Sequence, residues 1–382
     1  MKALSGAASD WFVRPAARRW RTAPLADDVR LFHRTMPGYA ETPLVEVPAV
    51  AAELQVGRVF VKDESSRLGL PAFKILGASY AVSRALAARY GIGPRAVPLS
   101  ELADRTATDR TLTMSAATDG NHGRAVARVG SILGVAVTIY VPAAISAAAK
   151  AAIAAEGARL VELDLPYDDV VDAVAEQGRL AGPGHVVVQD TAWDGYEQIP
   201  RWIVDGYSTL FAETDAQLAA AGAANLDFVV VPVGVGAFAQ AAVHHYRSGR
   251  HAPTVLTVEP DRAPAVITSL RENRPVTVMT QPTIMAGLNC GTPSSIAWPY
   301  LVAGVDAAVT VTDAAAALAV ADLAAAGLDS GPCGAATLAG ARAVLLEPDR
   351  RADFALGEDA VLVLFSTESR AANPLPNLET AP

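Results

Sequence analysis

Residues 228–243, FVVVPVGVGAFAQAAV, contain the pattern that decides the fold class. A run of mostly β-branched residues, Phe228–Val231, leads into a glycine-containing turn, and a helical stretch opens at Ala237. Similar apolar runs, each read as a buried strand, are Val59–Val61, Val135–Val141, Val186–Val188 and Val255–Val258. Because near-continuous apolar strands alternate with helices, we predict an α/β fold with mostly parallel sheets covered by helices.

Helical stretches separate these strands. They are expected at about Lys74–Tyr90, Asn121–Leu133, Ile145–Ala155, Asp168–Leu180, Tyr196–Ala221, Ala237–Tyr246 and Asp313–Ala326. The length of 382 residues favours two domains rather than one.

Composition excludes several classes of function. The chain is 51% hydrophobic and 19% charged, and its net charge of −9 argues against a nucleic-acid partner. No segment approaches the roughly 20 continuous apolar residues of a membrane span. Met1–Ala8 is followed by charged residues rather than by a secretory apolar segment. Cys290 and Cys333 do not have the spacing of metal ligands, so we expect no metal. The two cysteines could form a disulfide, but free thiols in a reducing cytoplasm are the simpler interpretation.

The turn after Phe228–Val231 has the residues of an anion site. Gly234, Gly236 and Ala237 let backbone N–H groups and the positive end of a helix approach a phosphate. The third glycine of a dinucleotide fingerprint is missing and no Walker lysine follows, so a nucleoside triphosphate is not expected. Glycine-rich turns are common between strands and helices, and this signal alone is weak.

Lys74 stands in ESSRLGLPAFKILGASY, residues 64–80, with apolar neighbours on both sides. Burial disfavours an ammonium and lowers its pKa, as a Schiff-base nucleophile requires. The alternative is a lysine that extends to the surface from an amphipathic helix.

A third polar turn lies in SAATDGNHGRAVA, residues 115–127. Thr118, Asp119, Gly120 and Asn121 follow an apolar run and precede a helix, which is where open α/β proteins bind ligands. The alternative is that Asp119 or Asn121 caps the helix. His122 taken alone is more often structural than catalytic.

A lysine, an asparagine turn and a glycine loop in this order are typical of fold-type II pyridoxal-phosphate (PLP) enzymes, the tryptophan synthase β-like superfamily. From about Pro43 to Glu368 the chain resembles the diaminopropionate ammonia-lyase family. The segments that carry the resemblance are KDESSRLGLPAFKILGASYA (62–81), ATDGNHGRAVA (117–127), QDTAWDGYEQIPRWIVDGY (189–207), VGVGAFA (233–239), VEPDRA (258–263), TIMAGLNCG (283–291) and FSTE (365–368).

The resemblance implies a three-layer α/β fold with a large PLP-binding domain, residues 1–82 and 225–382, and a small domain, residues 83–224. It implies PLP as cofactor, a small amino acid as substrate and a homodimer. The implied reaction is β-elimination of ammonia from 2,3-diaminopropionate, giving pyruvate and a second ammonia.

The site residues follow from the same resemblance. Lys74 is implied to carry the cofactor, Asp119 to be the base for the D isomer, and Asp190 to bind the β-ammonium of the substrate. The residues implied to hold the cofactor are Lys74, Phe73, Asn121, Gly234, Val235, Gly236, Ala237, Phe238, Ser366 and Thr367, with Ser366 or Thr367 facing the pyridine nitrogen.

Two departures from the family pattern bear on the site: Pro332-Cys333 in a glycine-rich segment, and Ser369 in place of a glycine. Two rival functions remain. One is a serine/threonine dehydratase-like lyase on the same fold, although two carboxylates suit a second ammonium better than a hydroxyl. The other is a non-catalytic PLP-fold binding protein, against which the presence of Lys74 and both aspartates speaks.

Overall fold

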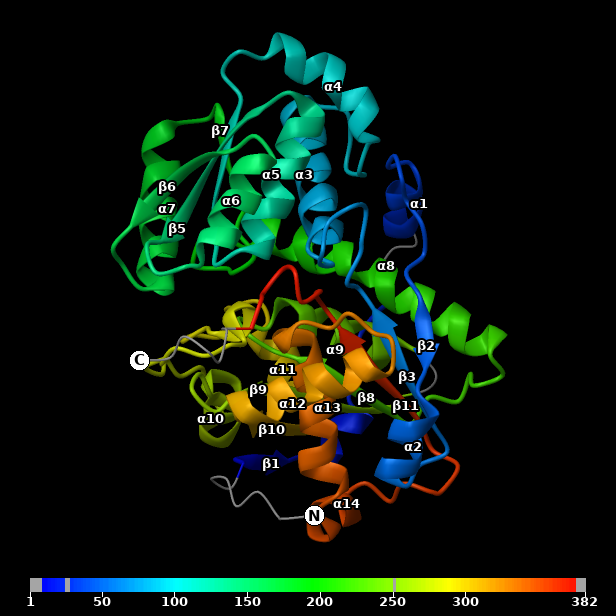
Figure 1. The fold of residues 1–382 in the computed structure, drawn as a ribbon. Helices are drawn as coiled ribbons and strands as arrows, with labels where there is room; N and C mark the ends of the chain where they lie inside the picture. The colour runs from blue at the N-terminus through cyan, green and yellow to red at the C-terminus, as the bar shows by residue number, and fades with distance from the viewer. Residues whose placement is uncertain (1–8, 25–27, 250–251, 376–382) are drawn as a thin grey trace.

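The computed structural model describes residues 9–24, 28–249 and 252–375 (Figure 1). Its strands form two sheets, a seven-stranded sheet of order β1-β10-β9-β8-β11-β3-β2 and a four-stranded sheet of order β6-β5-β4-β7. The strands are β1 (Trp11–Val13), β2 (Leu44–Glu46), β3 (Arg58–Asp63), β4 (Thr113–Ala117), β5 (Ala136–Pro142), β6 (Arg159–Leu163), β7 (His185–Val187), β8 (Phe228–Pro232), β9 (Thr254–Pro260), β10 (Ala307–Val311) and β11 (Val361–Ser366). Met1–Ala8, where no secretory apolar segment is expected, lies outside the described residues.

Helices cover both sheets, which confirms the predicted α/β class. The α-helices are α1 (Asp28–Arg34), α2 (Pro48–Leu54), α3 (Ile75–Arg89), α4 (Leu99–Thr108), α5 (Asn121–Leu133), α6 (Ala147–Ala155), α7 (Tyr167–Ala181), α8 (Gln198–Ala220), α9 (Ala237–Ser248), α10 (Ala265–Glu272), α11 (Trp298–Gly304), α12 (Asp313–Ala325), α13 (Pro332–Leu345) and α14 (Pro348–Ala352). Two 3₁₀ helices, η1 (Pro15–Arg19) and η2 (Ala286–Leu288), complete the described elements. In the described ranges no helix is both long and apolar enough to cross a membrane.

Both sheets are mostly parallel. Only the edge strands β1 and β2 run antiparallel to their neighbours. At the centre of the large sheet Val363 of β11 lies opposite Val229 of β8 and Phe60 of β3. These central strands are buried on both faces, which explains why they read as continuous apolar runs.

The two sheets use different parts of the chain. All strands of the four-stranded sheet come from residues 113–187, whereas the seven-stranded sheet takes strands from residues 11–63 and 228–366. Figure 1 shows the two sheets with their helices as two lobes, with α8 running along the boundary. The predicted domain limits fall inside α3, at residues 82/83, and between α8 and β8, at 224/225; these limits stay a prediction.

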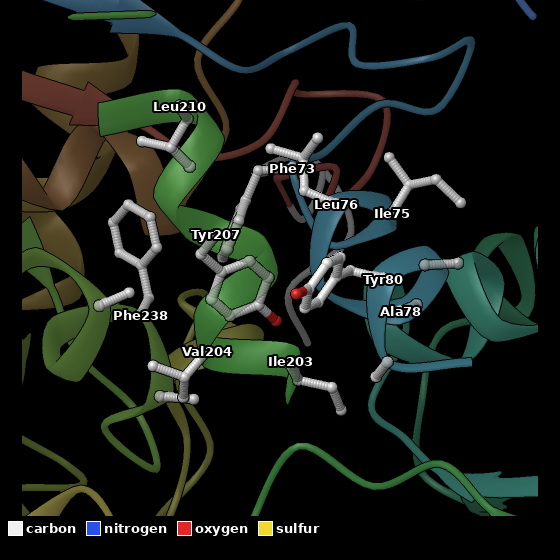
Figure 2. Packing of buried hydrophobic residues seen from close by; sticks show 14 of the residues in the cluster. Phe73, Ile75, Leu76, Ala78, Tyr80, Ile203, Val204, Tyr207, Leu210 and Phe238 are labelled. Carbon is white, nitrogen blue, oxygen red and sulfur yellow. The ribbon is translucent and has the colours of Figure 1, made fainter. Parts of the chain in front are cut away.

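Helices α3 and α8 pack closely where the lobes meet. A Cβ at Gly77 would lie 2.5 Å from Tyr207 Cε1, and one at Gly206 would lie 2.6 Å from the carbonyl oxygen of Leu76, so both positions need glycine. Figure 2 shows Tyr207 between Phe238 and the side chains of α3. The Phe73 ring lies 4.7 Å from that of Tyr207 and 4.6 Å from that of Phe238, measured between centroids. This aromatic packing fixes the backbone on which Lys74 stands.

Two segments for which the sequence analysis expected no element are helical. In the charged stretch 95–110, most residues form α4, whose Leu99 and Leu102 are buried while its charged residues face outward. The glycine-rich segment 329–340 is largely helical, because Pro332 occupies the first turn of α13, where proline is tolerated.

Candidate active site

The predicted site segments lie at the carboxyl ends of strands from both sheets. Asp119 follows β4, Asp190 follows β7, Gly234 follows β8, and Thr367 follows β11. Ligands in open α/β sheets bind at this edge. Lys74, just before α3, is linked to the same edge because Ala72 forms an antiparallel bridge with Glu368.

A cavity at this edge brings most of the predicted residues together; we call it the inner cavity. The predicted residues that line it are Phe73, Lys74, Asp119, Asn121, Asp190, Gly234, Val235, Gly236, Ala237, Phe238 and Thr367. Ser366 is not among them: it is fully buried and its hydroxyl bonds to that of Ser330 at 2.8 Å. Of the two hydroxyl residues predicted for the cofactor nitrogen, only Thr367 therefore reaches the inner cavity.

Lys74 and Asp190 form an ion pair in the inner cavity. Lys74 Nζ donates to Asp190 Oδ2 at 2.6 Å. His122 Nδ1 lies 3.8 Å from the same oxygen, and its Nε2 donates to the Val188 carbonyl at 2.7 Å. His122 thus contributes to this site as well as to packing, which the sequence analysis did not predict.

This ion pair overturns the expected direction of the Lys74 pKa. Burial is the largest single effect and would lower the pKa, as predicted. The charge and hydrogen bond of Asp190, together with Tyr207 and Asp119, outweigh burial, and the pKa is raised. Burial also opposes ionisation of Asp190, yet His122 and Lys74 lower its pKa to about 2. The two groups therefore form a charged pair.

Asp119 is a carboxyl group of this cavity whose pKa lies near neutrality. Burial, together with the charge of Asp190, raises its pKa to about 7 against the opposing effect of Lys74. Its predicted alternative role as a helix cap is wrong. Helix α5 has no side-chain cap at its N-cap residue, Gly120, and Thr118 Oγ1 instead accepts from the N–H groups of Gly120 and Gly123 at 2.9 and 3.0 Å.

Asn121 is held by a residue that the sequence analysis did not single out. Its Nδ2 donates to Glu368 Oε2 at 2.6 Å. Glu368 is 2% exposed and lines the inner cavity. The signal available in the sequence was a carboxylate directly after the strand end that supplies Thr367.

The glycine turn after β8 fits a phosphate. The first-turn N–H groups of any helix lack intrahelical partners. In α9 the N-cap residue provides no side-chain cap for them either. Gly236 adopts φ +99°, and a Cβ there would lie 3.0 Å from Ala297 Cβ and Leu301 Cδ1. Uncapped N–H groups at the start of a helix form an anion site, here directed to the inner cavity that Lys74 lines.

The two cysteines and Ser369, which departs from the family pattern, are also buried in this region. Cys290 and Cys333 are free, buried and line the inner cavity, and burial raises the pKa of both thiols. The N–H of Cys333 donates to Glu368 Oε1 at 3.2 Å. Ser369 is buried, and its N–H donates to the Pro71 carbonyl at 2.9 Å.

A second, larger cavity of about 570 Å³ adjoins the first; we call it the outer cavity. The two share a wall made by Asp119, Asn121, Tyr167, Gly287 and Glu368. The outer cavity therefore meets the inner cavity, which Lys74 lines, along this wall.

Comparison with known proteins agrees with this geometry. The family model described as "Pyridoxal-phosphate dependent enzyme" matches residues 35–366. A diaminopropionate ammonia-lyase of Escherichia coli strain K12 is 36% identical over 351 residues, covering 89% of this chain and 87% of the relative. The chain belongs to the diaminopropionate ammonia-lyase family of pyridoxal-phosphate dependent enzymes.

Other members of the diaminopropionate ammonia-lyase family match similarly. The enzyme of Salmonella typhimurium strain LT2 is 36% identical over 281 residues, covering 72% of this chain and 69% of the relative. The crystal structure of the Escherichia coli diaminopropionate ammonia-lyase in complex with D-serine superposes with a TM-score of 0.85 at 31% identity, covering 95% of each chain. The predicted fold-type II architecture and PLP dependence are thereby confirmed.

Proposed function

We propose that this protein catalyses β-elimination of ammonia from 2,3-diaminopropionate, giving pyruvate and ammonia, with PLP as cofactor. The observation that carries the proposal is the Lys74–Asp190 pair in one cavity with the uncapped start of α9. The relatives that are named diaminopropionate ammonia-lyase align with most of this chain.

The residues fit the cofactor in charge and shape. Lys74 would hold it through Nζ, the N–H groups of residues 234–238 would bind its phosphate, and Asn121 and Thr367 would contact the ring. When bound, PLP withdraws electrons from Cα of the substrate and so acidifies the Cα–H bond. The protein's part is to orient the substrate and to move protons.

Lys74 and Asp119 are the proposed bases. The amine of Lys74, once free of the cofactor, can take the Cα proton of the L isomer. The D isomer presents that proton to the opposite face, so a second base is needed. Asp119 has a pKa of about 7, where a base works well at neutral pH.

Asp190 is proposed to hold the free amine of Lys74 in position and to bind the β-ammonium of the substrate. Its carboxylate stays ionised at neutral pH. Loss of the β-amine as ammonia then leaves a product that hydrolyses to pyruvate and a second ammonia.

We further propose a cytoplasmic homodimer with domains 1–82 plus 225–382 and 83–224. The free thiols of Cys290 and Cys333 fit a reducing compartment. The small domain would contain the whole four-stranded sheet. The dimer rests on the family resemblance.

The rival function is loss of water from serine or threonine, since the Escherichia coli relative was crystallised with D-serine. Pyruvate or 2-oxobutyrate release, followed with lactate dehydrogenase and NADH, decides between the two. We expect kcat/KM for diaminopropionate to exceed those for serine and threonine. A higher kcat/KM for serine or threonine would make the protein a dehydratase, and no turnover of any of the three would favour a non-catalytic protein.

A further inference from the structure

Glu368 lies where a substrate side chain would pass from the outer to the inner cavity. It follows β11 directly and lines both cavities. Only 2% of its surface is exposed. A side chain in this wall contacts whatever stands between the entrance and Lys74.

Neutral donors hold the Glu368 carboxylate in place. Oε2 accepts from Asn121 Nδ2 at 2.6 Å, and Oε1 accepts from the N–H of Cys333 at 3.2 Å and from Asn373 Nδ2 at 3.4 Å. These bonds come from three separate elements and fix the position of the carboxylate. A fixed acceptor costs little reorganisation when a ligand arrives.

The charge of Glu368 has no cationic counterpart in the part of the chain that the structure describes. Two other buried carboxylates have a cationic partner: Glu213 pairs with Lys62 at 2.9 Å, and Asp190 pairs with Lys74 at 2.6 Å. Buried Glu259 has none, but it accepts two backbone N–H bonds at 2.9 and 2.7 Å and lines neither cavity. Among the described residues no Lys, Arg or His lies within 4.0 Å of Glu368. Burial raises its pKa, which agrees with a charge that lacks a partner.

The hydrogen bonds of Glu368 to Asn121 and Cys333 do not require a charged side chain. A glutamine could accept the N–H of Cys333 equally well, and the amide of Asn121 could rotate to meet it. What only the carboxylate offers is a negative charge beside the path to Lys74. A buried charge of this kind is stabilised by a cation, and 2,3-diaminopropionate brings a second ammonium.

We propose that Glu368 is a specificity-determining residue that receives the β-ammonium group of a diamino acid, together with Asp190. This inference rests on the proposed function. Asp190 already has Lys74 as a partner, and Asp119 is assigned the role of base, so Glu368 is the remaining cavity carboxylate that can receive a cation from the substrate. A serine hydroxyl carries no charge and gains less from this residue.

The test compares the ratio of kcat/KM for diaminopropionate to kcat/KM for serine in the parent and in Glu368→Gln. We expect the variant to lose about 10- to 100-fold for diaminopropionate, as for one charge-assisted hydrogen bond, and less than about threefold for serine. Asp329→Asn is the charge control, since Asp329 is half exposed and pairs with Arg370 at 2.6 Å. Its ratio should match that of the parent.

A second readout uses 2-aminobutyrate, which has a methyl group where diaminopropionate has the ammonium. Spectral titration of the bound cofactor gives its affinity without turnover. Glu368→Gln should bind 2-aminobutyrate as tightly as the parent or more tightly. Equal weakening of 2-aminobutyrate and diaminopropionate would show that Glu368 only positions Asn121, and would overturn the proposal.

The proposed function and this inference fail in different ways. If the parent releases no pyruvate from diaminopropionate, the proposed function fails. If the parent is active and Glu368→Gln keeps the parent ratio within about twofold, the specificity role fails. Should Glu368→Gln not fold, Glu368→Asp keeps the charge but withdraws it by one methylene; an unchanged ratio there would also contradict the proposal.

Discussion

Lys74 Nζ lies 2.6 Å from Asp190 Oδ2, although the two residues are 116 positions apart in the chain. Lys74 precedes α3, and Asp190 follows the last strand of the four-stranded sheet. Their pairing brings the ends of both sheets to one point. It also favours the charged form of Lys74.

Lys74→Ala should abolish turnover and the visible absorbance band of the bound cofactor, because no other amine lines the inner cavity in the described part of the chain. Its circular dichroism spectrum should match that of the parent. The measurement is an absorbance spectrum after incubation with PLP and gel filtration. A yellow, active Lys74→Ala protein would refute the assignment.

Asp119→Asn should reduce kcat/KM for D-diaminopropionate by roughly 10²- to 10⁴-fold, the usual contribution of a positioned base, and spare most of the L-isomer rate. Since Asp119 does not cap α5, the melting temperature should not fall. Each enantiomer is assayed separately, with a melting curve as control. Equal losses on both isomers would remove Asp119 from the role of base.

The D-isomer reaction should also report the pKa of Asp119 near 7. A base must be deprotonated, so kcat/KM for the D isomer rises as pH increases through about 7, and the L-isomer profile lacks this step.

The raised pKa of Asp119 also affects stability. Because the pKa is higher in the folded than in the unfolded protein, the protonated carboxyl adds stability at low pH that is lost as pH rises from 3.8 through about 7. The melting temperature of Asp119→Asn minus that of the parent should therefore increase between about pH 4 and pH 7, and a constant difference would contradict the shift.

Gly236→Val should weaken PLP binding at least tenfold by spectral titration, because its Cβ would crowd Ala297 and Leu301 and disturb the start of α9. Gly327→Val is the matched control. Gly327 also has positive φ, +82°, but nothing lies within 4 Å of its Cβ position. If both variants bind PLP like the parent, the loop does not hold the phosphate.

Gly206→Ala should destabilise the fold by about 1–3 kcal/mol, the usual cost of overpacking, because its Cβ would lie 2.6 Å from the Leu76 carbonyl oxygen. Forcing α3 away from α8 also moves Lys74. The expected result is a lower unfolding midpoint in urea together with weaker PLP binding. A parent-like midpoint would mean that the crossing of the two helices adapts freely.

Secondary structure could be predicted from the sequence more fully than the ionisation and tertiary contacts of the site residues. The strand Phe228–Val231 and the helix Asn121–Leu133 could be predicted because burial on both faces and a helical apolar period leave direct patterns. The direction of the Lys74 pKa could not, since it depends on Asp190, which only the folded chain brings within 2.6 Å. Ser366 and Thr367 are neighbours on one strand end, and side-chain alternation decides which of them faces the cavity. Glu368 gave no periodic signal, because its contacts with Asn121 and Cys333 are all tertiary.

The most direct test of the account is the nitrogen balance of the reaction with 2,3-diaminopropionate. Pyruvate is measured with lactate dehydrogenase and ammonia with glutamate dehydrogenase in the same samples. Elimination of the β-amine followed by hydrolysis predicts two ammonia molecules for each pyruvate. One ammonia for each pyruvate, or consumption of the substrate without pyruvate, would contradict it.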